Sequence, residues 1–530
     1  MIIHQIPFDR IDQIAPRDKA YALQAPELRS FYKYPPSLEG FGAAIQDKSK
    51  EALRRDLLVK VLKEQYQNIP TSEQVKANIE RLADDNTFTV TTAHQPSLFT
   101  GPLYYIYKII STIKLAQQLT EHYPAYQFVP IFITGGEDHD FEEVNHLHLF
   151  GKTISWESGE SGSVGMMKSE SLATVLEAVK QVLGSSENAN KISAVLEAAV
   201  SEQAFYSGTA RQLADALFQT YGLVQLDGNH AALKRSFIPI IKEEIFQQVS
   251  KPLVEATVAQ LEALGFSEQA FPREINFFYL MPGLRERIVW TGEFYEVLNT
   301  EWRFSRESLE QEIEQYPERF SPNVVMRPLY QEWLLPNLAY IGGGGELAYW
   351  LERKSQFEHF GINYPVLVRR NSVLWIDDTH AQKMEKLGLG VEALFEETEQ
   401  LIKDYVKSQT EHELSLEEEK DHLTQLYQSV EAKANSIDPT LAKAVAAEAT
   451  KQYKVLEQLE GRLMRAEKLK HDTAINQIRS LKEKLFPGNG LQERKDNFIP
   501  FYLKYGASFF EVLMKELEPL QAEFVVVVDG

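Results

Sequence analysis

The sequence predicts an α/β protein in which a parallel-sheet core is interrupted by an insertion and followed by a long antiparallel helical hairpin. The first observation behind this fold class is a strand, helix, strand order between residues 88 and 134. The second is the return of a strand, glycine loop, helix, strand order after residue 320. The third is a stretch rich in Glu, Lys, Ala and Leu over residues 388–486, which is typical of long packed helices.

The composition is that of an ordinary globular protein. The chain has 530 residues, of which 44% are hydrophobic, and at about 150 residues per domain this length indicates roughly three to four structural units. No apolar run approaches the roughly 18 residues that a membrane span needs, and the first residues lack the apolar core of a signal peptide. We therefore expect a cytoplasmic protein without a membrane partner.

Charge and cysteine content exclude several classes of function. The formal net charge of −21 argues against general nucleic-acid binding, which needs a basic surface, so small molecules are the expected ligands. The absence of cysteine excludes disulfides, thiolate nucleophiles and Cys-ligated zinc. Any metal site would have to use His, Asp and Glu side chains.

The first half of the core follows a helical flank. Residues 1–85 are mostly polar and helix-prone, and residues 86–151 form the first half of the core. In that half the segments "FTVTTAHQ" and "FVPIFITGG" are strands on either side of the helix "GPLYYIYKIISTIKLAQQL". This is a βαβ unit with parallel strands, and ligands bind such sheets beyond the carboxyl ends of the strands.

The second half of the core follows an insertion. Residues 152–320 contain amphipathic helices and strands such as "YGLVQLDG" and are interpreted as an insertion. Residues 321–387 return to the strand, loop, helix order and form the second half of the same sheet. Residues 487–530 are a C-terminal segment that we expect to pack at the base of the hairpin and on the core.

Residues 388–486 predict a coiled-coil helical hairpin. Apolar residues recur there at the spacings of three and four that a helix-packing seam requires: Leu456, Leu459, Leu463, Ala466, Ala474, Ile478, Leu481 and Leu485. A turn around Pro439 makes the two helices antiparallel. The seam joins the two helices within the chain, and its exposed part is also suited to a second subunit, which makes a homodimer the expected partner.

The segment "GGEDHDFEEVNH" carries the clearest chemical signal. Four ionisable residues follow a predicted strand in consecutive positions: Glu137, Asp138, His139 and Asp140. Such crowding pushes pKa values apart, which suits acid/base chemistry in a substrate site. If the segment continues as a helix, His139, Glu143 and His146 lie near one face as a candidate metal triad. In the third interpretation, Asp138 or Asp140 only caps the helix.

Two glycine-containing loops place polar groups at strand ends. His94 and Gln95 end the first predicted strand, and Thr100 and Gly101 precede a helix-starting proline, where free backbone N–H groups bind anions. In "GGGGELAYW" the glycines let the backbone approach a ligand closely. The first loop is also compatible with a helix start and nothing more, and a glycine run by itself is weak evidence for a site.

These segments resemble one protein family. The similar segments are, in chain order and over nearly the whole chain, "AHQPSLFTGPLYYIYKIIS", "GGEDHDFEEVNH", "NVVMRPLYQEWLLPNLAYIGGGGELAYW" and "LFPGNGLQERKDNF". The chain resembles the bacillithiol synthase family, the cysteine-adding enzymes of bacillithiol biosynthesis. The resemblance implies a Rossmann-type core related to class I aminoacyl-tRNA synthetases, a connecting-peptide insertion, and a coiled-coil domain that mediates dimers.

The resemblance also implies a reaction, the formation of an amide between the carboxyl group of cysteine and the amine of glucosaminyl malate. "AHQP" stands where class I synthetases have their first histidine signature, with one histidine rather than two, and "KMEK" resembles their second signature. Forming an amide from a free carboxylate is uphill in water, so we expect ATP to activate the substrate. We favour a site without metal, in which shape and hydrogen bonds select cysteine.

Roles follow for individual residues. We expect His94 and the helix start at Thr100 to stabilise phosphate or carboxylate charge, and Asp138 or His139 to assist deprotonation of the attacking amine. The substrate-binding candidates are Gln95, Thr100, Gly101, Glu137, Asp140, His146, Arg327, Asn337, Glu346 and Tyr349. The nucleotide-binding candidates are Gly343, Gly344, Gln492, Arg494, Asn497, Tyr502 and Tyr505. For the last five residues, which lie near the C-terminus, the alternative is a polar clamp between hairpin and core.

Two functions from other classes remain open. One is a metal-dependent hydrolase or deacetylase that uses His139, Glu143 and His146. The other is a non-catalytic scaffold in which the hairpin is the active part, although the ionisable groups at two strand ends argue against it.

Overall fold

The computed structural model describes residues 1–410 and 414–529, and the chain divides into two compact units. One unit comprises Gln5–Leu374 and Gln492–Val525, and the other comprises Met1–His4, Trp375–Leu491 and Val526–Gly530. The chain passes between the units four times. Three of these crossings fall inside the strands β1 (Ile2–Pro7), β14 (Ser372–Ile376) and β15 (Glu523–Val528), and the fourth falls between Leu491 and Gln492. None of the described helices combines the length and the apolar character that crossing a membrane requires.

A five-stranded parallel sheet forms the centre of the larger unit, as predicted. Its strands are β2 (Thr87–His94), β3 (Gln127–Thr134), β6 (Val224–Asp227), β12 (Asn337–Gly342) and β13 (Val366–Arg369). They run in the order β13-β12-β2-β3-β6, and every neighbouring pair is parallel. The chain therefore proceeds outward from β2 in one direction and from β12 in the other. The switch point between β2 and β12 is where ligands bind in such sheets.

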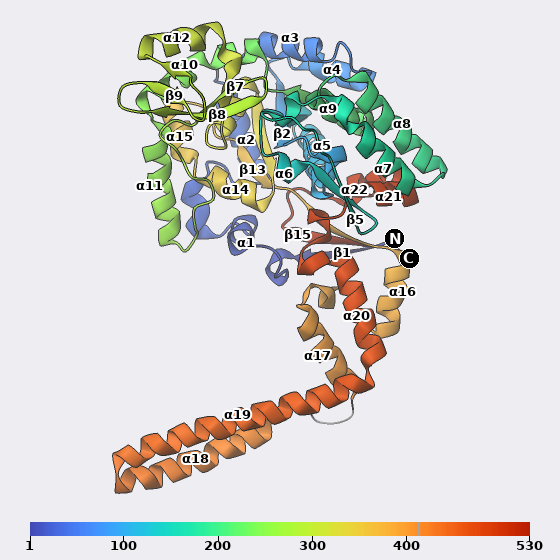
Figure 1. Ribbon diagram of the computed structural model, residues 1–530, viewed down its shortest axis with the longest axis vertical. Coiled ribbons are helices and arrows are strands. Elements are labelled where there is room, and N and C mark those ends of the chain that lie inside the picture. Colours follow the sequence, from blue (N-terminus) through green and yellow to red (C-terminus); the bar gives the residue numbers. More distant parts are fainter. Residues whose placement is uncertain (411–413, 530) are drawn as a thin grey trace. The chain divides into compact units, whose positions relative to one another are not determined.

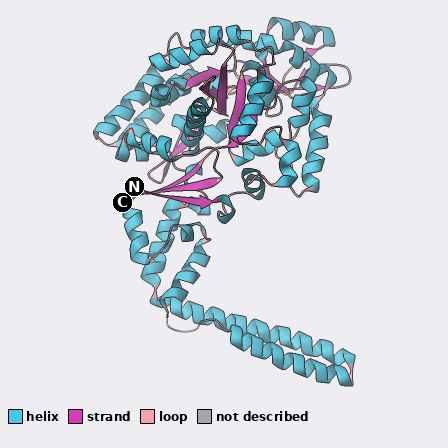
Figure 2. Ribbon diagram, turned by 180° about the vertical axis from the view of Figure 1, so that it is seen from behind, coloured by secondary structure: helices cyan, strands magenta, loops and turns pink. Residues whose placement is uncertain are grey.

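Helices cover both faces of this sheet because alternate strand residues are apolar on each side. The helices of this unit are α1 (Pro16–Ala22), α2 (Leu38–Lys48), α3 (Arg55–Gln65), α4 (Glu73–Arg81), α5 (Tyr104–His122), α6 (Phe141–Val144), α7 (Ala173–Leu183), α8 (Glu187–Glu202), α9 (Tyr206–Phe218), α10 (Ala231–Gln247), α11 (Ser250–Ala263), α12 (Arg306–Gln315), α13 (Arg327–Leu334), α14 (Gly344–Leu351), α15 (Lys354–Phe360), α21 (Ile499–Tyr505) and α22 (Ser508–Glu516). Val90 packs with Leu119 of α5 on one face, and Leu226 packs with Phe237 of α10 on the other. Figure 2 shows the strands of this unit enclosed by helices.

The predicted insertion contributes directly to the core, which the sequence analysis did not expect. Strand β6, which corresponds to "YGLVQLDG", pairs in parallel with β3 through residues such as Val224 and Leu226. Both side chains are buried on one face of the sheet, because residues two apart in a strand point to the same side, and they lie in one apolar cluster with Phe237 of α10. Four residues are too few to tell a buried core strand from one in a separate domain by periodicity alone.

The rest of residues 152–320 forms mostly helices and an antiparallel sheet. The sheet has the order β10-β9-β8-β7-β11, with β7 (Phe277–Met281), β8 (Leu284–Trp290), β9 (Tyr295–Val297), β10 (Arg303–Phe304) and β11 (Phe320–Pro322). A two-stranded hairpin, β4 (His146–Leu149) with β5 (Lys152–Ser155), follows α6. Strands β8 and β11 supply polar side chains to the site described below.

The second unit contains the predicted antiparallel hairpin. Its helices are α16 (Asp378–Leu387), α17 (Thr398–Gln409), α18 (Glu417–Ile437), α19 (Pro439–Lys470) and α20 (Asp472–Leu485). Figure 1 shows α18 and α19 side by side. The side chain of Asp438 accepts the backbone N–H of Thr440 at 2.8 Å, which caps α19 at its proline start.

The predicted seam is only partly buried in α19. Leu456 is partly buried, whereas the side chains of Leu459 and Leu463 are 42% and 43% exposed. Lys420 of α18 pairs with Glu460 of α19 at 2.6 Å. The α20 half of the seam is buried, but Ile478 packs against α17 through residues such as Ile402. A heptad pattern indicates that a face is apolar and does not indicate which helix covers it.

Candidate active site

A cavity of about 610 Å³ lies at the carboxyl end of the parallel sheet, and residues that end or follow all five strands line it. These residues are His94 and Gln95 after β2, Gly135, Glu137 and Asp138 after β3, Gly228 and Asn229 after β6, Gly343–Glu346 after β12, and Arg370 after β13. The cavity thus brings together the two polar clusters that the sequence analysis placed at this edge.

Glu346 is held at the base of this cavity by a buried lysine. Nζ of Lys108 in α5 lies 2.9 Å and 2.8 Å from the two carboxylate oxygens of Glu346. The hydroxyl of Tyr340 and the backbone N–H of Gly343 donate to the same carboxylate at 2.7 Å and 2.9 Å. Burial opposes ionisation, but Lys108 outweighs it and lowers the pKa of Glu346 to about 2. Glu346 is therefore a fixed negative charge at neutral pH.

The same carboxylate limits what the glycine run can bind, where Gly343 and Gly344 were named as nucleotide-binding candidates. Because Glu346 accepts the N–H of Gly343, that amide is not free for an anion, and the helix start is already capped by a carboxylate. A Cβ at Gly344 would lie 2.2 Å from Cγ of Asp18, whereas a Cβ at Gly345 would meet nothing within 4 Å. A ligand can therefore approach the backbone at Gly345, which is the close approach that was expected of the glycine loop.

Arg327 supplies a positive charge on the same side of the cavity. Its Nη2 atom donates to the hydroxyls of Tyr349 at 2.5 Å and Tyr340 at 3.4 Å. Both tyrosine hydroxyls are neutral acceptors, so the guanidinium retains its full charge for an anionic ligand. Arg327, Glu346 and Tyr349, which were named as substrate-binding candidates, all line the cavity.

The acidic cluster after β3 is anchored by residues from other elements. Nε2 of Gln95 donates to Oδ2 of Asp138 at 2.7 Å, and Nη1 of Arg285 lies 3.4 Å from Oδ1. Burial opposes ionisation, but contacts with His139, Arg285 and Gln95 outweigh it and hold the pKa of Asp138 well below its usual range. Nη1 of Arg285 also donates to Nδ1 of His139 at 2.7 Å, so that nitrogen carries a lone pair.

Glu137 occupies a second buried ion pair of the cluster. Its carboxylate lies 2.5 Å from Nζ of Lys234 in α10 and accepts the hydroxyl of Ser321 in β11 at 3.1 Å. Ser321 in turn accepts Nε of Arg285 at 3.2 Å. The antiparallel sheet of residues 277–322 therefore positions both acids that follow β3.

His94 is neutral and has a defined tautomer. Burial, together with the nearby Lys108 ammonium, lowers the pKa of His94 to about 4. Nδ1 lies 2.9 Å from the carbonyl oxygen of Gln95, which only accepts, so Nδ1 carries the proton and Nε2 carries the lone pair. His94 can exchange hydrogen bonds with a ligand but does not supply a positive charge at neutral pH.

Two arginines complete the polar lining near the C-terminal segment. Nη2 of Arg370 pairs with Glu493 at 2.8 Å, and both side chains are buried. Arg494 is exposed and lines the cavity, and within residues 1–410 and 414–529 it has no hydrogen bond or ion pair. Arg494 was predicted as a nucleotide contact, and it remains the most accessible positive charge at this site.

The predicted anion site at Thr100 and Gly101 is not part of the cavity. Thr100 is 3% exposed, and its hydroxyl has no partner among the described residues. Helix α5 begins at Tyr104, after a turn in which Phe99 and Thr100 adopt positive φ angles. Nδ2 of Asn497 donates to the carbonyl oxygens of Phe99 and Gly101 at 3.0 Å and 2.6 Å. Asn497 therefore holds this turn, where the sequence analysis expected a nucleotide contact.

Other predicted residues also lie outside the lining. They are Asp140, His139, His146, Asn337, Gln492, Tyr502 and Tyr505. Asn337 is fully buried in β12, where its amide oxygen accepts the hydroxyls of Thr89 and Thr91. Helix α6 spans only Phe141–Val144 and His146 starts β4, so the helix that the metal triad requires does not form. No group of three or more potential metal ligands occurs among the described residues.

Four charged residues at the site were missed by sequence reasoning: Lys108, Lys234, Arg285 and Arg370. The sequence contained features that could have identified two of them. Lys108 is a single lysine within the apolar run "YYIYKII", and Arg370 directly follows a predicted strand, at the sheet edge where His94 also lies. No sequence feature pointed to Arg285, because it reaches the site from an antiparallel strand far away in the sequence.

The parallel sheet, its switch point and a cavity lined by paired charges at five strand ends define a Rossmann-type protein built to bind a polar small molecule. Comparison with known families agrees in both units. Residues 1–371 match "Bacillithiol biosynthesis BshC, N-terminal Rossmann-like domain", and residues 373–528 match "Bacillithiol biosynthesis BshC, C-terminal coiled-coil domain". The chain belongs to the BshC family of bacillithiol biosynthesis, which confirms the resemblance and the fold class.

Curated relatives cover nearly the whole chain. A Flavobacterium johnsoniae protein is 43% identical over 509 residues, which is 96% of each chain. A Christiangramia forsetii protein is 40% identical over 532 residues, which is 99% of each chain. Both are named "Putative cysteine ligase BshC". A solved chain titled "crystal structure of putative arginyl t-RNA synthetase" from Campylobacter jejuni, 12% identical, covers 80% of this chain and 99% of its own with a TM-score of 0.21, which is too low to carry an argument.

Proposed function

We propose that this protein is a ligase that joins the carboxyl group of cysteine to the amine of glucosaminyl malate, with ATP as the source of free energy. The names of the relatives support a cysteine ligase. The observation that carries the proposal is that one cavity presents fixed carboxylates and accessible guanidinium groups together. Both substrates carry an amine and at least one carboxylate, so both kinds of group are needed.

The charged side chains of the cavity suit different groups of the substrates. Arg327 and Arg494 suit carboxylate or phosphate oxygens, because guanidinium groups bind such oxygens through paired hydrogen bonds. Glu346 and Asp138 suit ammonium groups, because both remain ionised at neutral pH. Asp138 is a weak base for the same reason, so holding an amine suits it better than removing its proton.

His94, which ends β2, is a neutral side chain on the cavity wall that can accept the proton of the attacking amine. As the new C–N bond forms, the amine nitrogen becomes positive and its proton becomes acidic. Nε2 of His94 carries a lone pair in the tautomer fixed by the Gln95 carbonyl oxygen. A histidine of low basicity is sufficient to receive this proton at that stage. His139 is less suited, because its Nδ1 atom already accepts from Arg285.

Activation must convert the cysteine carboxylate into a better acyl donor. An adenylate releases pyrophosphate and then AMP, whereas an acyl phosphate releases ADP and then phosphate. The groups on this chain that suit the phosphates are the Gly345 backbone and the side chains of Arg327 and Arg494. The nucleotide products distinguish the two routes directly.

We also propose that two copies associate through the hairpin. Leu426 and Val430 of α18, and Leu459 and Leu463 of α19, are exposed. Lys420 and Glu460 mark the contact between the two helices. At 100° per residue, Leu459, one position before Glu460, and Leu426 and Val430, six and ten positions after Lys420, are each rotated by about 100° from that contact in the same sense along the chain. Because the helices are antiparallel, this rotation turns both sets toward the same side. The apolar face that results would be buried by a second copy.

The test is a reconstituted reaction. Purified protein is incubated with cysteine, glucosaminyl malate and ATP, and the thiol product and the nucleotides are measured by mass spectrometry. We expect a product with the mass of the amide only when all three are present, and none with Glu346→Gln. Arg303→Gln, an exposed arginine on β10, is the matched control and should retain the rate. Absence of product with intact, folded protein would contradict the proposal.

A further inference from the structure

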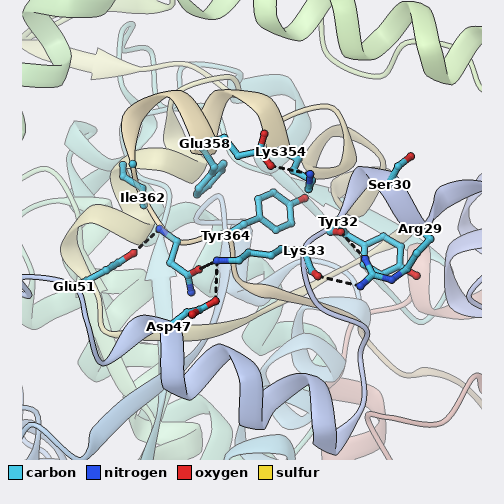
Figure 3. A pocket seen from close by; sticks show the side chains of 13 residues that line it. Arg29, Ser30, Tyr32, Lys33, Asp47, Glu51, Lys354, Glu358, Ile362 and Tyr364 are labelled. Carbon is cyan, nitrogen blue, oxygen red and sulfur yellow. Dashed lines mark hydrogen bonds and ion pairs between the residues drawn. The ribbon is translucent and has the colours of Figure 1, made fainter.

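A second cavity lies at the opposite end of strand β13. It has a volume of about 650 Å³ and is formed by α15, the loop Gly361–Tyr364 that precedes β13, the end of α2, and residues 29–33 (Figure 3). The catalytic cavity contains Arg370, which follows the same strand, and the two cavities share no lining residue. We propose that this second cavity binds the carboxylate of a small organic molecule.

Asn363 provides a buried hydrogen-bond donor without an acceptor. Nζ of Lys33 lies 2.7 Å from one amide atom of Asn363, and because an ammonium group only donates, that atom is the oxygen. Nδ2 therefore points elsewhere, and it is buried without a partner among the described residues. Asn363 is 8% exposed and lines the cavity. A buried donor of this kind requires an acceptor, which an oxygen of a bound ligand would supply.

Arg29 provides a positive charge that no carboxylate neutralises. Its guanidinium donates to the backbone oxygens of Tyr32 at 3.0 Å and Lys33 at 3.3 Å and lies over the Tyr32 ring. Within the described part of the chain it has no Asp or Glu partner. The other lining cations do have one: Lys33 pairs with Asp47 at 3.0 Å and Lys354 pairs with Glu358 at 2.8 Å. Arg29 is thus the lining cation available to an anion.

The rest of the lining indicates a singly charged organic ligand. Rings of Tyr32, Phe357 and Tyr364 form apolar walls, which favour a hydrocarbon or aromatic body. The charged lining residues are Arg29, Lys33, Lys354, Asp47, Glu51 and Glu358, whose formal charges cancel. A phosphate with two negative charges would gain less from such a lining than a monocarboxylate, and a zwitterionic amino acid is compatible with it.

The probe for this site is 3-phenylpropanoate, a monocarboxylate with an aromatic body. Its binding to the full chain is measured by calorimetry and by saturation-transfer NMR. We expect saturable binding that weakens on the order of tenfold or more in Arg29→Gln and in Asn363→Asp, since each removes a charge-assisted or buried hydrogen bond. Asn363→Asp is nearly isosteric and keeps the oxygen that accepts from Lys33, so folding should be retained. If it does not fold, Arg29→Gln decides alone.

The controls separate this site from the catalytic one. Glu346→Gln should bind the probe as wild type does, and Arg29→Gln should keep the ligase rate without probe. L-phenylalanine should compete with the probe, and inorganic phosphate should not. Equal binding by wild type, Arg29→Gln and Asn363→Asp, loss of binding in Glu346→Gln, or displacement by phosphate would each overturn the proposal. So would the absence of saturable binding to the wild-type chain.

Discussion

Nζ of Lys108 lies 2.8 Å from Oε2 of Glu346 and 2.5 Å from the carbonyl oxygen of Ala93. The lysine thereby ties α14 to the end of β2, across the switch point of the sheet. Only 1% of the Lys108 side chain is exposed, so the pair fixes a carboxylate in the cavity with little screening by solvent.

This pair gives the first prediction. Lys108→Met should reduce the free energy of unfolding by about 2–3 kcal/mol, because it leaves a carboxylate that is only 26% exposed without its charged partner. Glu346→Gln added to Lys108→Met should restore most of that stability but not the ligase activity. Urea unfolding and product formation are measured for both single variants and the double variant. Equal losses of stability in the double variant and in Lys108→Met would contradict this role for the pair.

The second prediction concerns the role of Asp138. If it holds an ammonium group, Asp138→Asn should raise the KM of an amine substrate on the order of tenfold or more while kcat changes less, since a charged hydrogen bond is replaced by a neutral one. Asp140→Asn is the matched control, because Asp140 is exposed and outside the cavity lining. A fall in kcat with an unchanged KM would instead assign Asp138 as the base.

The third prediction separates the turn at residues 98–101 from catalysis. Thr100→Val should leave kcat/KM unchanged within about twofold, because the hydroxyl has no partner among the described residues and is not at the cavity. Gly101→Ala should be strongly destabilising, because Gly101 has φ +59° and a Cβ would lie 2.7 Å from Cβ of Ser97. A large loss of activity in a folded Thr100→Val variant would restore Thr100 as an anion ligand.

The fourth prediction is a pH dependence of stability. Burial raises the pKa of Glu332 to about 7, from an ordinary value of 4.5. A raised folded-state pKa contributes stability that is fully present below about 4.5 and is lost as pH rises through about 7. Glu332→Gln mimics the protonated acid and keeps the oxygen that accepts from Gln331 and Asn337. The variant should therefore gain stability over wild type as pH rises from 4.5 to 8, by on the order of 2–3 kcal/mol.

Denaturant unfolding of both proteins at several pH values measures this difference. Because other groups titrate equally in both proteins, only the difference between the two curves is informative. A difference that stays constant between pH 4.5 and 8 would show that Glu332 ionises as an ordinary glutamate.

The fifth prediction tests the proposed homodimer. Leu459→Glu with Leu463→Glu should shift the chain from dimer to monomer in sedimentation analysis at micromolar concentration, because charges would be placed on the proposed apolar interface. The helix should be retained, since Glu is a good helix former and both positions are exposed. Lys454→Glu with Arg462→Glu, also exposed on α19, is the matched control and should leave the dimer intact. A monomeric wild-type chain would contradict the proposal.

The strand ends show how far sequence reasoning could go at the site. His94 and Asp138 were assigned to one edge because β2 and β3 could be recognised as parallel strands, and carboxyl ends of parallel strands meet at the same edge. Glu346 followed from the same rule. Thr100 was placed at this edge wrongly. The prediction assumed that the helix begins at Pro102, whereas the chain makes a turn with positive φ angles that buries the Thr100 hydroxyl.

The sequence by itself determined the period of each segment, and through it the parallel sheet, the antiparallel hairpin and the strand ends that carry polar residues. Tertiary structure alone decided that β6 joins the core, that Arg285 and Lys234 reach the acids after β3, and that Leu459 stays exposed on the hairpin. The physical reason is that hydrophobic periodicity reports which side of an element is buried. The neighbour that buries it, and the charge that pairs with a buried acid, depend on contacts between residues far apart in the chain.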